Sequence, residues 1–162
     1  MIYNTDHFTQ VPTDIILTFR ARHGASRTRS IQEFEKHYPD AVRGAKQIAD
    51  RNDPVPGRLL VTHHDRKTGV LRRDGNLCIL HGVVRSNAGD PIDVRALDVT
   101  LAAARQFLLQ SSHTSIQILK DGIRRDDIGW PLFHDRVQAA FKGCNTHDRR
   151  IVINGSPAQL SR

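Results

Sequence analysis

Short apolar runs alternate with segments of helical periodicity along most of the chain, and this alternation restricts the possible folds more than any other feature. The run over 13–19 (TDIILTF) is nearly continuous in apolar and β-branched residues, which is typical of a strand buried on both faces of a sheet. Strands of this kind, separated by helices, favour parallel pairing with helices packed on each face. We therefore expect an α/β protein, a three-layer α/β/α sandwich around a mixed, mainly parallel central sheet.

The other elements follow from the same patterns. Further strands are expected at 58–63, 76–84, 115–119 and 150–153, with a candidate edge strand at 1–3, and helices at 31–51, 92–109 and 131–141. Pro39 is expected to divide the first helix because proline interferes with the preceding helical turn. Residues 20–30 (RARHGASRTRS) are expected to form a loop, and 64–75 a hairpin-like connection. With no repeat or linker, residues 1–162 are expected to form one domain.

The formal net charge is +7, and arginine greatly outnumbers lysine. Arginine suits planar, bidentate contacts with phosphate, so a nucleotide or a nucleic acid is a candidate partner, although basic character also reports non-specific attraction. No apolar stretch is long enough to span a membrane, and the first residues do not resemble a signal peptide. Cys78 and Cys144 lie far apart and are expected to be reduced thiols. These features favour a cytoplasmic protein without a membrane partner.

Three histidines could have either a functional or a structural role. His63 and His64, followed by Asp65, could begin a metal site, but adjacent residues of a strand point to opposite faces, so we expect none. His81 is expected to be a buried or lining histidine rather than a general base. No P-loop pattern and no GxSxG motif are present, which argues against a P-loop NTPase and an α/β-hydrolase. No cofactor is expected.

The segment from Ser115 to Trp130 (SIQILKDGIRRDDIGW) is a short apolar run followed by a polar loop, and a helical pattern follows at once. This order places backbone N–H groups and a helix N-terminus at the carboxyl end of a strand, where open α/β sheets bind phosphorylated ligands. The loop holds Arg124 and Arg125 beside two aspartates. Trp130, the only tryptophan, closes it. The sequence therefore predicts an anion site here.

The order of these motifs resembles a macrodomain. The motifs are FEKHYPD at 34–40, PVPGRLLV at 54–61, and SIQIL–loop–IGW–helix. The similarity is greatest to the branch of antitoxin-type and terminal-glutamate-type ADP-ribosylglycohydrolases. In that branch the second ligand loop typically reads GCGLGGLDW or a close variant. Gly122, Ile128 and Trp130 match its opening glycine, its later leucine and its tryptophan without gaps.

The resemblance implies that ADP-ribose, free or attached to a macromolecule, binds in a cleft above the strands. Its diphosphate would lie between two loops, here 23–30 and 120–128. The ligand-binding residues that this implies are Gly24, Ser26, Arg27, Arg29, Gly122, Ile123, Arg124, Arg125 and Trp130. Arg27 and Arg29 stand where the family usually has glycine, and arginine there could either contact phosphate or block the cleft.

The resemblance also implies a chemistry, since some members of this branch remove ADP-ribose from protein carboxylates or DNA bases. In one type, an aspartate of the second loop works with a lysine after the third strand. Asp126 falls on the aspartate position and is the candidate catalytic residue; alternatively, it caps the following helix or pairs with a neighbouring arginine. The lysine is missing, with Gly82 near that point and Arg85 as the nearest basic residue. Arginine stays protonated, so it is a poor substitute for a lysine base.

Three functions therefore remain open at this level. The chain could hydrolyse an ADP-ribosyl linkage, or it could bind ADP-ribose or a related nucleotide without catalysis. It could also be a basic interaction protein that binds nucleic acid or an acidic partner.

Overall fold

The computed structural model describes residues 2–5, 8–9, 11–24, 29–120, 122–124, 127–146 and 148–154, with only the backbone described at 2–5, 29 and 30. The strands are β1 (Ile2–Thr5), β2 (Ile15–His23), β3 (Leu59–His64), β4 (Leu77–Asn87), β5 (Ser115–Ile118) and β6 (Arg150–Asn154). The helices are α1 (Arg29–His37), α2 (Pro39–Asn52), α3 (Val94–Gln110) and α4 (Trp130–Ala140).

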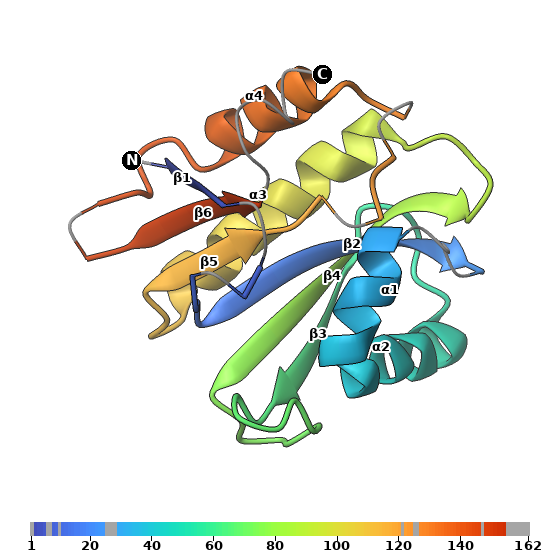
Figure 1. Ribbon diagram of the computed structural model, residues 1–162. Coiled ribbons are helices and arrows are strands. Elements are labelled where there is room, and N and C mark those ends of the chain that lie inside the picture. Colours follow the sequence, from blue (N-terminus) through green and yellow to red (C-terminus); the bar gives the residue numbers. More distant parts are fainter. Residues whose placement is uncertain are drawn as a thin grey trace.

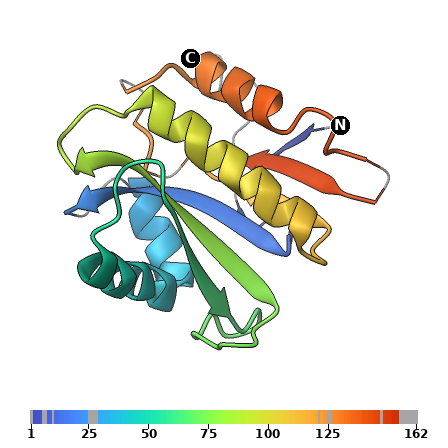
Figure 2. The ribbon, with the colours of Figure 1, turned by 180° about the vertical axis from the view of Figure 1, so that it is seen from behind.

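The strands form one six-stranded sheet in the order β1-β6-β5-β2-β4-β3. Among the strands that the structure describes, only the β3–β4 pair is antiparallel, so the expected mixed, mainly parallel sheet is confirmed. Helices α1 and α2 cover one face, and α3 and α4 cover the other (Figures 1 and 2). No helix in the described part of the chain has the length and apolar character needed to cross a membrane.

Strand β2 lies in the middle of the sheet and contributes to the core on both sides. Ile15, Leu17 and Phe19 belong to the large apolar cluster that includes residues of α3 and α4. Ile16 points the other way and packs in the cluster that includes Phe34 of α1. This alternation explains the nearly continuous apolar run, because a strand covered on both faces needs apolar side chains at successive positions.

The structure corrects the carboxyl end of this strand. The sequence predicted a loop from Arg20 onward, but β2 continues to His23. The extension exists because β4 is also longer than expected, and the two strands pair in parallel as far as His23 and Asn87. Pairing with a neighbouring strand outweighs the weak strand preference of this basic segment. Arg20 and Arg22 are therefore strand residues.

The pairing between β2 and β4 contains a β-bulge. Arg20 pairs with Val83, but Ala21 pairs with Arg85, which leaves Val84 as an extra residue in β4. In a regular pairing of the same residues, Val84 would lie opposite Ala21, and Arg85 would follow His81 and Val83 on the α1/α2 face. With the bulge, Arg85 lies beside Ala21 and faces the α3/α4 side, as expected for a bulge that redirects a side chain.

The break in the first helical pattern occurs where it was predicted. Helix α1 ends at His37, and α2 starts at Pro39, which occupies the first turn where proline needs no backbone donor. The two helices thus meet at a sharp angle on one face of the sheet, with α2 beside β3 (Figure 1). This arrangement forms one wall of the cavity described next.

Candidate functional site

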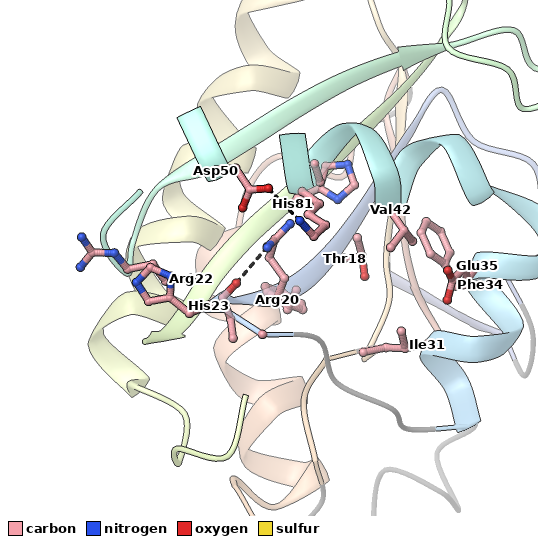
Figure 3. A pocket seen from close by; sticks show the side chains of 15 residues that line it. Thr18, Arg20, Arg22, His23, Ile31, Phe34, Glu35, Val42, Asp50 and His81 are labelled. Atoms are coloured by element: carbon pink, nitrogen blue, oxygen red, sulfur yellow. Dashed lines mark hydrogen bonds and ion pairs between the residues drawn. The ribbon is translucent and has the colours of Figure 1, made fainter. Parts of the chain in front are cut away.

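A cavity of about 470 Å³ lies between the carboxyl-terminal half of β2 and the helices α1 and α2 (Figure 3). Its polar and charged lining residues are Thr18, Arg20, Arg22, His23, Glu35, Lys46, Asp50 and His81. Its apolar lining comes from Phe19, Ala21, Ile31, Phe34, Val42 and Ala45, with Gly24 at the end of the strand. Its volume falls in the range typical of small-molecule pockets, and so does its mixture of apolar walls with a few polar groups.

The chemistry of the cavity changes along one face of β2. Ile16, Thr18, Arg20 and Arg22 alternate along the strand and share the face toward α1 and α2. The series therefore runs from an apolar core residue through a hydroxyl to two cations. Successive members are about 6.6 Å apart along the strand, because each residue adds about 3.3 Å.

Arg20 lies between Thr18 and Arg22 on the side of β2 that faces the cavity. Its Nε donates to the carbonyl oxygen of Ala21 at 2.9 Å, while its Nη atoms make no hydrogen bond with any residue that the structure describes. Burial lowers the pKa of Arg20, and the charge of Asp50 opposes that effect. Arg20 thus presents a partly buried positive charge whose hydrogen-bonding capacity is only partly used.

Three further charged groups of the lining, Lys46, Asp50 and Arg22, are paired. Lys46 Nζ lies 2.7 Å from Asp50 Oδ2, and this hydrogen bond lowers the pKa of Asp50. At the rim, Arg22 makes two parallel contacts with Asp53, Nε to Oδ1 at 2.8 Å and Nη2 to Oδ2 at 2.7 Å. These pairs leave Arg20 as the basic group best placed to meet an anion inside the cavity.

Thr18 and His81 are neighbours on the floor of the cavity, since they pair in register across β2 and β4. His81 is buried, and its Nε2 lies 2.9 Å from Thr62 Oγ1. Burial lowers the pKa of His81 to about 3, and the positive charge of Arg20 and the nearby His64 act in the same direction. The prediction of a buried or lining histidine is confirmed, and the imidazole is neutral near pH 7.

The second loop begins with a close backbone contact. Gly122 has φ = +84°, and a Cβ at this position would overlap the carbonyl oxygen of Phe19. Only glycine combines this conformation with such a close approach. The next residue, Ile123, is buried in the cluster that includes α3 and α4.

Asp127 is the central residue of the described part of this loop. Its carboxylate accepts hydrogen bonds from the backbone N–H of Arg124 at 2.8 Å and from the guanidinium groups of Arg124 and Arg85. Arg85 also donates to the carbonyl oxygen of Gly122. Burial alone would raise the pKa of Asp127, but the hydrogen bonds from Arg124 and the charge of Arg85 outweigh it and lower the pKa.

This arrangement changes the interpretation of the predicted anion site. A backbone N–H and two guanidinium groups do converge in the second loop, as anion binding requires, but the anion they hold is the chain's own Asp127 carboxylate. Arg124 is tied to Asp127 and also donates to the carbonyl oxygen of Asp90 at 3.2 Å. Sequence analysis missed the roles of Asp127 and Arg85, because the bulge that brings them together leaves no local signal.

The remaining predicted ligand residues divide into two groups. Gly24 lines the cavity with φ = +80°, and Trp130 begins α4, with Lys120 Nζ 5.4 Å from its ring centre. Ser26, Arg27, Arg125 and the candidate catalytic Asp126 lie outside the described residues, as does the side chain of Arg29.

The adjacent histidines point to opposite faces of β3, as predicted. His64 is buried beside Thr62, whereas His63 Nδ1 lies 3.3 Å from Cys78 Sγ. Cys78 and Cys144 are both buried free thiols, and burial raises the pKa of Cys78. Over the described ranges, no group of three or more His, Cys, Asp or Glu residues is placed to hold a metal ion.

Solved macrodomain structures match this chain over nearly its whole length. The macrodomain of Thermus aquaticus DarG matches with a TM-score of 0.77 at 14% identity, covering 96% of this chain and 99% of that chain. The macrodomain of Mycobacterium tuberculosis DarG gives 0.76 at 16% identity, covering 96% and 97%. This chain has the macrodomain fold.

A further match is to Thermosipho africanus DarTG in complex with ADP-ribose, with a TM-score of 0.69 at 9% identity. The match covers 92% of this chain and 41% of that one. A scan against models of known protein families finds no match, and neither does a search of curated proteins. The macrodomain fold is thus shared while the sequence has diverged, and the cavity lies at the carboxyl end of β2, the edge where α/β sheets bind ligands.

Proposed function

We propose that this chain binds ADP-ribose, and that Arg20 contacts the ligand's diphosphate from the cavity beside β2. The observation that carries the proposal is the guanidinium of Arg20, which is partly buried and has Nη groups that donate to no described residue. A buried cation is stabilised by a nearby anion, and the carboxylate of Asp50 already accepts from Lys46. The planar fork of arginine matches the geometry of phosphate oxygens.

The fold and the overall charge support this choice of ligand. A structure with the same fold contains ADP-ribose, and the net charge of +7 favours an anionic ligand. Gly24 ends the strand at the cavity in a left-handed conformation, which allows the backbone to approach a ligand closely. We extend the proposal to Ser26, Arg27, Arg29 and Arg125, which the resemblance of the sequence to macrodomains implies as ligand contacts.

The position of Asp127 argues for Arg20, rather than the second loop, as the main diphosphate contact. In the loop, the N–H of Arg124 and both guanidinium groups already serve the Asp127 carboxylate. A second anion there would face the negative charge of Asp127 at short range. In the cavity on the α1/α2 side, the carboxylate whose charge acts on Arg20 is that of Asp50, and it is paired with Lys46.

We propose binding without hydrolysis. A general base works best when its pKa lies near the working pH, but Asp50 and His81 on the cavity wall each have a pKa lowered away from neutrality. Arg85, the basic residue after the third predicted strand, is buried in its ion pair with Asp127. The protein would then recognise ADP-ribose, free or attached to protein or nucleic acid, as a reader. Hydrolysis with Asp126 as general base is the alternative.

Isothermal titration calorimetry with ADP-ribose tests the proposal. Wild type is expected to bind, and Arg20→Ala to lose at least about tenfold in affinity, since a charge-assisted hydrogen bond contributes about 1.5–3 kcal/mol. Arg136→Ala is the matched control, because Arg136 pairs with Asp98 on the opposite face of the sheet. Absence of binding by wild type at millimolar ligand would refute the function. Equal affinities of wild type and Arg20→Ala would refute the role of Arg20.

A further inference from the structure

A buried chain of hydrogen bonds leads from the loop after β3 to the floor of the cavity. His64 Nδ1 lies 2.9 Å from the carbonyl oxygen of Gly69, and His64 Nε2 lies 2.7 Å from Thr62 Oγ1. Thr62 Oγ1 in turn lies 2.9 Å from His81 Nε2. All three side chains are buried, and His81 lines the cavity.

The positions of the protons along these hydrogen bonds follow from the carbonyl oxygen of Gly69 at one end. A carbonyl oxygen only accepts, so His64 Nδ1 carries the proton that it donates to Gly69. Burial lowers the pKa of His64, so its ring is neutral and Nε2 is an acceptor. The single hydroxyl proton of Thr62 then points to His64 Nε2 at 2.7 Å rather than to the more distant carbonyl oxygen of Ile79 at 3.5 Å, and Thr62 Oγ1 accepts from His81.

His81 therefore holds its own proton on Nε2. Its Nδ1 keeps a lone pair and forms no hydrogen bond with any residue in the described part of the chain. Thr18, its neighbour in register on β2, is also buried and lines the same cavity. The floor thus combines one fixed acceptor with one hydroxyl that can donate or accept (Figure 3).

The carbonyl group of Gly69, at the end of this hydrogen-bond series farthest from the cavity, is held in place by contacts within its loop. The backbone N–H of Gly69 donates to the carbonyl oxygen of Asp65 at 2.8 Å, and Asp65 Oδ2 accepts from both the N–H and the hydroxyl of Thr68. Gly75 lies so close to His64 that a Cβ there would overlap the His64 backbone. The loop after β3 therefore clamps the residue that sets the tautomer of His81.

We propose that the Gly69–His64–Thr62–His81 chain fixes His81 Nδ1 as a hydrogen-bond acceptor for a sugar hydroxyl of the ligand. This inference rests on the proposed function and adds an orientation to it. A lone pair attracts a hydroxyl donor and disfavours an anionic oxygen, so a ribose belongs at His81 and Thr18. Arg20, two residues beyond Thr18 on the same face, takes the phosphate. The ligand then enters with a neutral ribose inward and its diphosphate toward the rim.

The first part of the test uses the free, full-length protein. Histidine labelled with ¹⁵N is examined by NMR, and the His81 signals are assigned by their loss in His81→Asn. The expected result is a proton on Nε2 and none on Nδ1. A proton on Nδ1, or a mixture of tautomers, would overturn the proposal whether or not any ligand binds.

The second part adds ligands separately: ADP-ribose, ADP, ribose and inorganic phosphate. ADP-ribose, ADP and ribose each carry a ribose and are expected to shift the His81 Nδ1 resonance, while inorganic phosphate leaves it in place. If ADP-ribose binds without moving this resonance, the proposed function stands and the ribose site is wrong. If ribose moves it but ADP-ribose does not bind, the ribose site stands and the proposed function is wrong. If ADP-ribose does not bind and ribose does not move the resonance, the proposed function and the ribose site are both wrong.

Substitutions of Thr62 separate the hydrogen-bond chain from simple packing. Thr62→Val removes the hydroxyl while keeping the branched shape, and Thr62→Ser keeps the hydroxyl while removing a methyl group. We expect Thr62→Val to lose the single tautomer of His81 and to bind ADP-ribose about fivefold more weakly, as for one neutral hydrogen bond. Thr62→Ser should keep both properties. Loss of the single tautomer in both variants, or in neither, would contradict the proposed relay.

Discussion

Arg85 on β4 places its Nη2 2.9 Å from Asp127 Oδ2, and both side chains are almost completely buried, with 4% and 2% of their surface exposed. The pair joins the middle of the sheet to the loop that precedes α4. Arg85 also donates to the carbonyl oxygens of Gly122 and Asp90, so one guanidinium connects three backbone segments. The geometry of the second loop therefore depends on a residue 42 positions away in the sequence.

Replacing Asp127 with asparagine tests this dependence. The variant keeps the shape but removes the charge, which leaves the buried guanidinium of Arg85 uncompensated. We expect a loss of about 3 kcal/mol in the free energy of unfolding, measured by urea denaturation. Asp98→Asn is the control, since the Asp98–Arg136 pair is partly exposed and should cost less than about 1 kcal/mol. Equal losses in the two variants would contradict a structural role for Asp127.

Gly122→Ala tests the contact between the second loop and β2. The substitution adds a left-handed backbone penalty of about 1 kcal/mol and an overlap with the carbonyl oxygen of Phe19, so the total loss should clearly exceed that penalty. Gly143→Ala separates the two effects, because Gly143 also has positive φ but open space around its Cβ position. Thermal unfolding should show a large decrease in Tm for Gly122→Ala and a small one for Gly143→Ala. A decrease no larger at Gly122 would rule out the close approach to β2.

The buried histidines should make stability fall in mild acid. The pKa of His81 is about 3 in the folded protein because of burial, with Arg20 and His64 adding to the effect, and burial also lowers the pKa of His64. Histidine in the unfolded chain titrates at about 6.5, so below that pH the unfolded chain binds more protons. The free energy of unfolding should therefore be fully maintained above about pH 6.5 and decrease toward about pH 3, by at most about 1.4 kcal/mol per pH unit for each proton.

Urea denaturation at several pH values between neutrality and mild acid measures this slope. His81→Leu removes one of the two titrating groups and should make the slope shallower. The lowered pKa of Asp127 predicts a further loss at lower pH, because a carboxylate stabilised by Arg124 and Arg85 loses that stabilisation when it is protonated. A free energy of unfolding that stays constant as the pH falls below about 6.5 would show that these histidines are not buried as neutral groups.

A turnover assay distinguishes a reader from a hydrolase. The chain is incubated with ADP-ribosylated protein and with ADP-ribosylated DNA, and release of ADP-ribose is followed by chromatography. We expect none above background, in wild type or in Asp126→Ala. Release by wild type that Asp126→Ala abolishes would establish the hydrolytic alternative, and release that survives the substitution would place the chemistry on another residue.

The layer architecture could be predicted from the sequence because it depends on local periodicity. Apolar runs such as 13–19 and the helical pattern after Pro39 carry the same information in the isolated segment as in the fold. The end of β2 could not be predicted in this way. Arg20 and Arg22 belong to a segment with weak strand preference, and only pairing with β4 as far as Asn87 makes them strand residues.

The site was only partly predictable for a similar reason. The segment around Gly122 could be recognised as an anion-binding loop. The sequence could not show that Asp127 would be the bound anion, because Arg85 contacts Asp127 only in the folded sheet. The cavity gathers Thr18, Lys46 and His81 from three elements. No local spacing in the sequence relates these residues to one another.

The extra residue in β4, Val84, also affects how such a chain can diverge. It decides on which side of the sheet Arg85 lies, since residues before it alternate toward the cavity and Arg85 faces the second loop. Deleting Val84 would remove the bulge but leave Arg85 opposite Ala21, still on the side of Asp127. Regular pairing that keeps Val84 would instead turn Arg85 toward the cavity and leave Asp127 without its buried cation. A change of local register therefore transfers a charge from a structural position to the ligand side while the chain keeps its length.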